Sequence, residues 1–241
     1  MAVAIVLAGG NGSRMNSDVA KQYIMLDGKE LLYYCLNTFE RNSEVTHIVL
    51  VTRAEDIEFC QSNIVDKYGF KKVRSIVAGG KQRYDSVYQG LLAAREIFDD
   101  PENDIVIIHD GARPFVTDEM ISESICEAKK TGACTVGVPV KDTIKIVDEN
   151  MLGISTPDRN SLFQIQTPQT FLYKLIMEAY KRLHREQNVN ITDDTTLLEQ
   201  YLGVKSKVIL GSYGNIKITT PEDLDMAEII IKTFRKIIKT S

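Results

Sequence analysis

The stretch Val3-Ala4-Ile5-Val6-Leu7-Ala8-Gly9-Gly10-Asn11-Gly12-Ser13-Arg14-Met15 runs from an apolar segment into a glycine-rich turn, and Lys21 follows a few residues later. Glycine has no Cβ and adopts positive φ angles easily, so the backbone N–H groups of such a turn can converge on phosphate oxygens. Arg14 and Lys21 would balance the phosphate charge. The pattern predicts a buried strand that leads into a polyphosphate site. The alternative is an ordinary strand-to-helix connection with two surface cations.

The spacing separates this turn from two better-known nucleotide loops. A Walker loop ends in Gly-Lys-Ser/Thr, which is absent here. A dinucleotide fingerprint needs a third glycine at the position that Met15 occupies. Hydride chemistry with a nicotinamide cofactor is therefore disfavoured.

Length and composition favour one enzyme-sized unit over residues 1–241. The chain has 241 residues, 44% of them hydrophobic, which is enough for one sizeable core. A net charge of −4 argues against a broad nucleic-acid-binding surface. No apolar run is long enough to span a membrane, and the N-terminus lacks the pattern of a secretion signal. We expect a cytoplasmic protein with no nucleic-acid or membrane partner.

Short apolar runs alternate with segments of helical periodicity along the chain. The expected strands are 4–7, 48–52, 74–77, 105–108, 135–140, 164–166 and 207–210. The expected helices are 31–39, 54–68, 86–98, 118–131, 171–187, 194–201 and 221–233. Nearly continuous Val/Ile strands separated by helices predict a doubly wound, mostly parallel, Rossmann-like α/β sheet that is buried on both faces. Ligands of such sheets bind at the carboxyl ends of the strands.

One segment, residues 139–160, departs from this alternation. Residues 143–147 alternate apolar and polar side chains, Asp148-Glu149-Asn150 is typical of a turn, and residues 152–156 read as a return strand. An isolated hairpin has too little apolar surface to be stable. We therefore expect a protruding β-hairpin arm that packs on another chain or over the active site.

Two further segments carry charges where a ligand is expected. Asp110 and Arg113 follow the strand 105–108 directly. The carboxylate suits Mg²⁺ and ribose hydroxyls and the arginine suits a second phosphate, whereas the structural alternative is a surface ion pair of little energetic value. Lys217 interrupts the apolar run Ile216–Ile218, which packing explains poorly. A phosphate contact explains Lys217 better.

Taken together, these segments resemble those of the polyol-phosphate cytidylyltransferases, most closely of the 2-C-methyl-D-erythritol 4-phosphate branch, and the resemblance covers nearly the whole chain. The segments that carry it are 7–15, Lys21-Gln22, Gly79-Gly80 with Arg83 and 85–87, 109–114, 142–145, 158–160, 166–169, 192–194 and 215–219. The resemblance implies a Mg²⁺-dependent transfer of CMP from CTP to a polyol phosphate, with release of pyrophosphate.

The resemblance also implies roles for individual residues, including a homodimer in which Arg159 reaches into the site of a second subunit. The residues expected to stabilise the reacting phosphates are Arg14, Lys21 and Lys217. Those expected to bind the nucleotide are Ala8, Gly9, Gly10, Gly12, Gly80, Ser86 and Asp110, of which Asp110 would also hold Mg²⁺. Those expected to bind the acceptor are Arg113, Thr143, Arg159, Thr167 and Thr192.

Two alternatives stay open at this point. Gly10 and Gly111 stand where alanine is usual in the methylerythritol branch, and residues 7–10 look more like the ribitol 5-phosphate branch. Residues 158–160 and 142–145 point back to the methylerythritol branch. The alternative from another class is a non-catalytic nucleotide-binding protein, which the joint retention of Arg14, Lys21, Asp110 and Lys217 disfavours.

Overall fold

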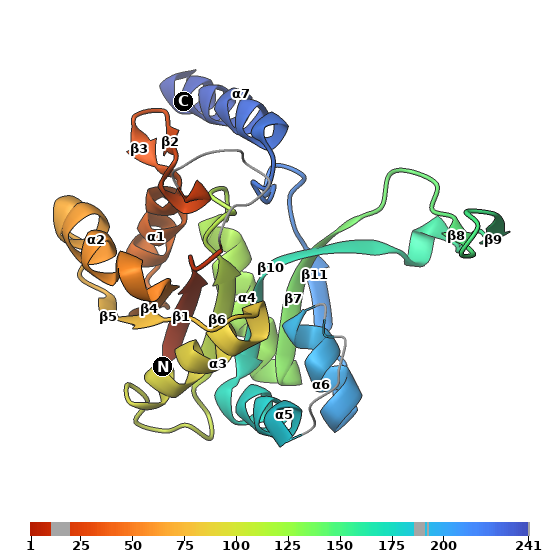
Figure 1. Ribbon diagram of the computed structural model, residues 1–241, viewed down its shortest axis with the longest axis horizontal. Helices are drawn as coiled ribbons and strands as arrows, with labels where there is room; N and C mark the ends of the chain where they lie inside the picture. The colour runs from red at the N-terminus through yellow and green to blue at the C-terminus, as the bar shows by residue number, and fades with distance from the viewer. Residues whose placement is uncertain (11–19, 186–190, 192, 241) are drawn as a thin grey trace.

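The structure is a computed structural model that describes residues 1–10, 20–185, 191 and 193–240 (Figure 1). Within that part of the chain the main sheet has seven strands in the order β11-β7-β10-β6-β1-β4-β5. Their bounds are β1 Ala2–Leu7, β4 His47–Thr52, β5 Val73–Ala78, β6 Ile105–Asp110, β7 Ala133–Pro139, β10 Phe163–Leu172 and β11 Lys207–Leu210. β10 runs antiparallel to both of its neighbours, and the remaining pairings are parallel. The expected mostly parallel sheet is confirmed.

Helices cover both faces of this sheet. The helices of the described residues are α1 Leu31–Arg41, α2 Ile57–Cys60, α3 Arg83–Arg95, α4 Asp118–Thr131, α5 Tyr173–Arg185, α6 Asp194–Leu202 and α7 Pro221–Thr240. Of these, α7 packs on Leu26 and Leu31 instead of on the sheet. Successive side chains of a strand point to opposite faces, so β1 contributes Ala4 and Val6 to the core beneath α1 and α4, and Val3 and Ile5 to the core beneath α3 and α5. The doubly wound architecture therefore follows from the apolar character of both faces of the central strands.

The segment around β10 differs from the sequence-based expectation. A strand was expected at 164–166 and a helix from residue 171, but β10 extends to Leu172 and α5 begins at Tyr173. The stretch 166–170 is Gln-Thr-Pro-Gln-Thr, which lacks the apolar pattern of a buried strand. Its polar side chains are satisfied inside the fold; for example, the hydroxyls of Thr170 and Ser124 lie 2.8 Å apart.

Smaller differences concern the connections. A short hairpin of β2 (Met25–Leu26) and β3 (Lys29–Glu30) was not anticipated. The expected helix 54–68 is divided into a 3-10 turn (Ala54–Asp56), α2 and a π-helical segment (Gln61–Asp66). None of the helices in the described residues is long and apolar enough to cross a membrane.

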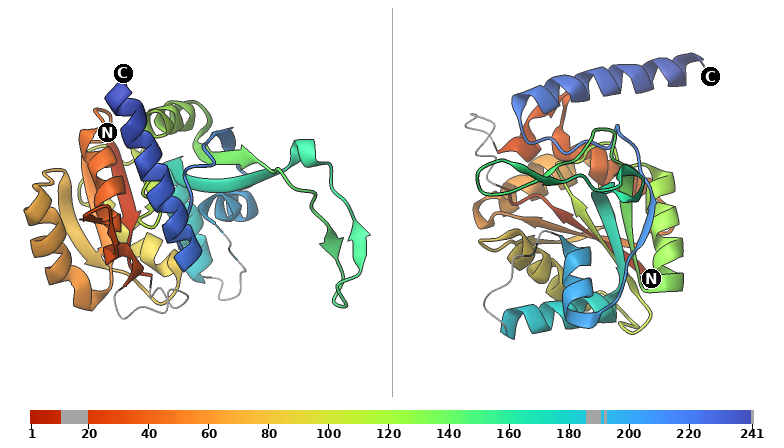
Figure 2. Two further views of the ribbon diagram at one scale, coloured as in Figure 1. Left: turned by 90° about the horizontal axis from the view of Figure 1, so that it is seen from above. Right: turned by 90° about the vertical axis from the view of Figure 1, so that its right-hand side faces the viewer.

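The segment between β7 and β10 leaves the body of the protein as a narrow projection (Figure 1, Figure 2). It carries the antiparallel pair β8 (Ile146–Val147) and β9 (Gly153–Ser155), and these strands are shorter than the sequence suggested. At the turn, Asp148 Oδ1 accepts hydrogen bonds from two backbone N–H groups, of Asn150 and Leu152. We refer to residues 139–160 as the arm.

Candidate active site

A cavity of about 590 Å³ lies at the carboxyl ends of β1, β4, β5 and β6, which is a volume typical of small-molecule sites. This is the edge of the sheet at which the α/β fold predicts a ligand. The residues of the sequence-based site that line it are Gly9, Gly10, Lys21, Gly80, Ser86, Asp110 and Lys217. The fold therefore gathers residues from five separate segments around one opening.

The turn after β1 forms one wall of the cavity. The N–H group of Ala8 donates to Val51 O at 2.7 Å, so this amide belongs to the sheet. A Cβ built on Gly10 would lie 3.6 Å from Lys21 Cε, which places the Lys21 side chain against the glycine turn. Gly12 and Arg14 lie outside the described residues.

The turn between β5 and α3 forms the opposite wall. Gly80 donates its N–H to Ser86 Oγ at 3.1 Å, and a Cβ on Gly80 would overlap Cβ of Asp85, so the tight turn requires glycine. Asp85 caps the helix by accepting a hydrogen bond from the Gln82 N–H at 3.0 Å. The helix begins at Arg83, three residues before the expected start at Ser86.

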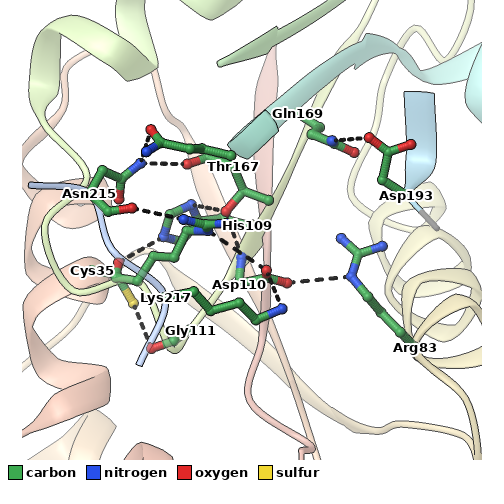
Figure 3. A network of polar contacts seen from close by, with 12 residues as sticks. Cys35, Arg83, His109, Asp110, Gly111, Thr167, Gln169, Asp193, Asn215 and Lys217 are labelled. Atoms are coloured by element: carbon green, nitrogen blue, oxygen red, sulfur yellow. Dashed lines mark hydrogen bonds and ion pairs between the residues drawn. The ribbon is translucent and has the colours of Figure 1, made fainter. Parts of the chain in front are cut away.

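Asp110, the last residue of β6, is the electrostatic centre of the site (Figure 3). Its Oδ2 lies 2.8 Å from Lys217 Nζ and 3.9 Å from Arg113 Nε, and its Oδ1 lies 3.4 Å from Arg83 Nε. The Asp110 N–H donates to Thr167 Oγ1 at 3.1 Å. Burial by itself raises the pKa of this carboxyl, but Arg83 and Lys217 outweigh burial and hold the pKa well below its usual range. Asp110 is therefore ionised at neutral pH.

Lys217 reaches Asp110 because the segment that carries it is attached by its backbone to the turn that follows β6. Ile218 N–H donates to Ala112 O at 2.9 Å. Asn215 is fully buried, donates from Nδ2 to Thr167 O at 2.9 Å, and accepts at its carbonyl oxygen from Arg113 Nη1 at 2.8 Å. Residues 215–219 are not part of a strand, which agrees with their absence from the expected strands.

Arg113 and Thr167 lie next to Asp110 but do not line the cavity. The Thr167 hydroxyl, besides accepting from Asp110, lies 3.0 Å from His109 Nδ1. The other ring nitrogen of His109 lies 3.1 Å from Arg113 O. Burial lowers the pKa of His109 to about 4, so the ring is neutral near pH 7.

The remaining acceptor-binding candidates lie elsewhere. Thr143 and Arg159 are exposed on the arm, and Arg159 Nη1 donates to Lys141 O at 3.0 Å. Thr192 lies outside the described residues. The structure brings neither arm residue to the cavity of its own chain.

Sequence reasoning assigned no role to Arg83 or Asp194, nor to Arg53 and Lys81, which line the cavity with Arg83. Arg83 Nη2 lies 2.8 Å from Asp194 Oδ2, although the two residues are 111 positions apart. Burial lowers the pKa of Arg83, but Asp194 and Asp110 outweigh burial and raise it well above its usual value. For Arg83 and Asp194, the only indication of a role in the sequence was that each lies in one of the segments that resemble the cytidylyltransferases.

The geometry can be compared with that of known proteins. A sequence profile of the family described as 2-C-methyl-D-erythritol 4-phosphate cytidylyltransferase (IspD) matches residues 2–233. The chain belongs to the IspD family. The match includes the β1 turn, Asp110, the arm and Lys217.

Individual relatives agree with the family match. The chain is 49% identical over 232 residues to a 2-C-methyl-D-erythritol 4-phosphate cytidylyltransferase of Alkaliphilus oremlandii, covering 96% of this chain and 95% of the relative. It is 47% identical to an enzyme of the same name from Clostridium botulinum, over 96% of this chain and 99% of the relative. The crystal structure of 4-diphosphocytidyl-2C-methyl-D-erythritol synthase from Anaerococcus prevotii is similar with a TM-score of 0.83 and 36% identity, over 96% of each chain.

Proposed function

We propose that the protein transfers CMP from CTP to 2-C-methyl-D-erythritol 4-phosphate, with release of pyrophosphate, as a step of isoprenoid precursor synthesis. The observation that carries this proposal is the pairing of Lys217 with Asp110 at a cavity of nucleotide size, in a chain that belongs to the IspD family. The proposal treats residues 1–241 as one nucleotidyltransferase domain, since segments from β1 to Lys217 contribute to one site.

The proposed reaction is a direct displacement at phosphorus. An oxygen of the acceptor phosphate forms a bond to the α-phosphorus of CTP, while the bond from that phosphorus to the pyrophosphate oxygen breaks. The acceptor phosphate is already ionised near neutral pH, so no side chain has to remove a proton. The protein's task is to align the two groups and to stabilise the developing negative charge.

The cations of the site are assigned to this task. Lys217 would contact the α-phosphate and the incoming phosphate, since it lines the cavity with its ammonium group 2.8 Å from Asp110. Lys21 would hold the triphosphate from the glycine-rich turn, with Arg14 as its partner in that role. Ammonium and guanidinium groups are the usual protein partners of phosphate oxygens.

The two glycine turns are assigned to the nucleotide. Gly9, Gly10 and Gly12 would bind the phosphates, ribose and cytosine together with the backbone carbonyl of Ala8, whose N–H is used in the sheet, and with Gly80 and Ser86. The absence of a Cβ at Gly10 and Gly80 lets a ligand approach the backbone closely. Asp110 would bind the ribose.

Asp110 is also the proposed protein ligand of Mg²⁺. Proteins commonly hold Mg²⁺ with one or two carboxylates together with substrate phosphates. The Asp110 carboxylate lines the cavity, and the described residues contain no group of three or more His, Cys, Asp or Glu side chains that could hold a metal by themselves. This arrangement fits an ion that is shared with the triphosphate. When bound, Mg²⁺ would neutralise phosphate charge.

The acceptor and the second subunit complete the proposal. Arg113, Thr167 and Thr192 are assigned to the acceptor, and Thr143 and Arg159 would reach it from the arm of the partner subunit of a homodimer. The exposed arm supports this, because its side chains are available to another chain. The four cysteines are unpaired, which is their usual state in the cytoplasm, the compartment that we propose.

The test measures pyrophosphate release from CTP and Mg²⁺ with 2-C-methyl-D-erythritol 4-phosphate, with ribitol 5-phosphate, or with no acceptor. We expect release with the first acceptor alone, and a preference for ribitol 5-phosphate would contradict the assignment. Lys217→Ala should reduce kcat at least about 100-fold, because a charge contact to the reacting phosphates is lost.

Lys174→Ala is the matched control for Lys217→Ala. Lys174 lies on the surface of α5, outside the cavity, and its Nζ is 3.3 Å from Glu102 Oε2. The activity of the Lys174→Ala protein should equal that of the parent protein. A Lys217→Ala protein with parental activity would reject the role of Lys217.

A further inference from the structure

We propose that Tyr180, in the middle of α5, is a positioning residue for nucleotide binding, acting through Asp194 and Arg83 on the carboxylate of Asp110. The inference rests on the proposed function, since it gives Asp110 a role at the nucleotide. Tyr180 does not line the cavity, and its side chain is fully buried.

A continuous series of short polar contacts joins Tyr180 to the site. Tyr180 Oη donates to Asp194 Oδ1 at 2.6 Å, and Arg83 Nη2 donates to Asp194 Oδ2 at 2.8 Å. Arg83 Nε then lies 3.4 Å from Asp110 Oδ1. Figure 3 shows the last of these contacts, between Arg83 and Asp110.

Asp194 is held rigidly enough to transmit a position. It is fully buried as the first residue of α6, and its N–H donates to Gln169 Oε1 at 3.0 Å. Gln169 Nε2 donates in turn to Asp193 Oδ2 at 2.9 Å, and Asp193 caps the helix through Thr196 N–H at 2.8 Å. The backbone of Asp194 is thereby fixed to β10, and only rotation of its carboxylate remains.

The hydrogen bond from Tyr180 fixes the orientation of the Asp194 carboxylate. Because the Tyr180 hydroxyl occupies Oδ1 of Asp194, Oδ2 is the oxygen that faces Arg83. The Arg83 guanidinium group therefore contacts two carboxylates, those of Asp194 and Asp110. The contact to Asp194 is shorter than the contact to Asp110 by 0.6 Å, which follows from distances of 2.8 and 3.4 Å. Arg83 therefore makes its closer contact with Asp194, and the longer contact leaves Asp110 Oδ1 able to accept a hydrogen bond from the nucleotide.

The loss of the hydroxyl has a predictable effect on this division. In Tyr180→Phe one oxygen of a buried carboxylate loses its donor, which is costly, so the carboxylate turns toward the remaining donor, Arg83. Arg83 then shifts relative to Asp110, and the carboxylate is no longer oriented for the nucleotide. Tyr180→Phe should weaken CTP binding about tenfold.

The chain provides a closely matched control on the same helix. Tyr173 is also buried and also donates a single hydrogen bond, from Oη to Leu91 O at 3.1 Å, but it has no contact with the series. Tyr173→Phe therefore removes a buried tyrosine hydroxyl from the same helix, but one that bonds a neutral carbonyl instead of a carboxylate. Both variants should lose thermal stability, and Tyr180→Phe should lose more because its hydroxyl bonds a charged group.

The experiment is titration calorimetry of CTP in Mg²⁺ buffer with the parent protein, Tyr180→Phe and Tyr173→Phe, together with their melting temperatures and the KM of each substrate. We expect the CTP dissociation constant and the KM for CTP to rise about tenfold in Tyr180→Phe alone, with the acceptor KM unchanged. CTP binding within twofold of the parent, or an equal effect of Tyr173→Phe, would overturn the inference. A parent protein that binds no CTP would instead overturn the proposed function, and the inference with it.

Discussion

At the scale of single residues, Asp110 and His109 show how neighbouring positions of one buried strand serve different ends. Asp110 is surrounded by three cations and is ionised, whereas His109 points into the core, is fully buried and is neutral. Both are joined by the Thr167 hydroxyl. We therefore expect protonation of His109 to change the free energy of unfolding and not the binding of the nucleotide.

His109 makes the stability of the protein depend on pH. Its pKa is about 4 in the folded protein, against about 6.5 in an unfolded chain. Between these values the unfolded chain binds more protons, so stability is complete above about pH 6.5 and falls as the pH is lowered. We expect the free energy of unfolding to drop by on the order of 2 kcal/mol between pH 7 and pH 5, measured by urea titration.

The comparison protein for this measurement is His109→Gln. Burial also lowers the pKa of His47, but His47 is present in both proteins, so the difference between their slopes isolates His109. The variant should lose stability less steeply between pH 7 and pH 5. Equal slopes would show that His109 does not carry the effect.

At the scale of elements, α3 combines a functional end with a structural middle. Its first turn supplies Arg83 and Ser86 to the cavity, while Gly90 packs against the central strands. A Cβ on Gly90 would lie 2.5 Å from Ile5 Cγ2 and 3.1 Å from Val51 Cγ2. Close approach of α3 to β1 and β4 therefore depends on this glycine.

Gly90→Ala tests this close packing. Alanine favours a helix by about 1 kcal/mol over glycine, but overpacking a core commonly costs about 1–3 kcal/mol. We expect a net loss of unfolding free energy of about 1–2 kcal/mol by urea titration. Gln89→Ala, at the exposed neighbouring position, should stay within about 0.5 kcal/mol of the parent. A stabilised Gly90→Ala protein would show that α3 can move outward freely.

At the scale of the whole molecule, the arm exposes apolar side chains that nothing in the described part of its own chain covers. Its side chains Met151, Leu152 and Ile154 are 77, 66 and 65% exposed. Contiguous apolar side chains on a projecting hairpin are typical of an interface with another chain. This is the physical basis for the proposed homodimer, in which each arm would lie against the partner's body.

Ile154→Lys should disrupt that dimer. A charge in an apolar interface must be desolvated, so we expect sedimentation velocity to show the mass of one chain where the parent protein shows two. Ile229→Lys on α7 changes the same residue type at a similarly exposed position away from the arm and should leave the mass unchanged. A parent protein that sediments as one chain, or an unaffected Ile154→Lys dimer, would contradict the role of the arm.

Local features of the sequence were enough to predict the alternation of strands and helices, the glycine turn after β1 and the position of Asp110 at a strand end. These depend on residues that are near one another along the chain, namely on apolar periodicity and on glycine. The length and direction of β10 were not predictable in this way, because its polar residues are buried only through partners such as Ser124 and Ser212. The same holds for the pairing of Arg83 with Asp194 and of Lys217 with Asp110. Tertiary structure decided these contacts, because a charge chooses its partner by distance in space and the packing of the sheet sets that distance.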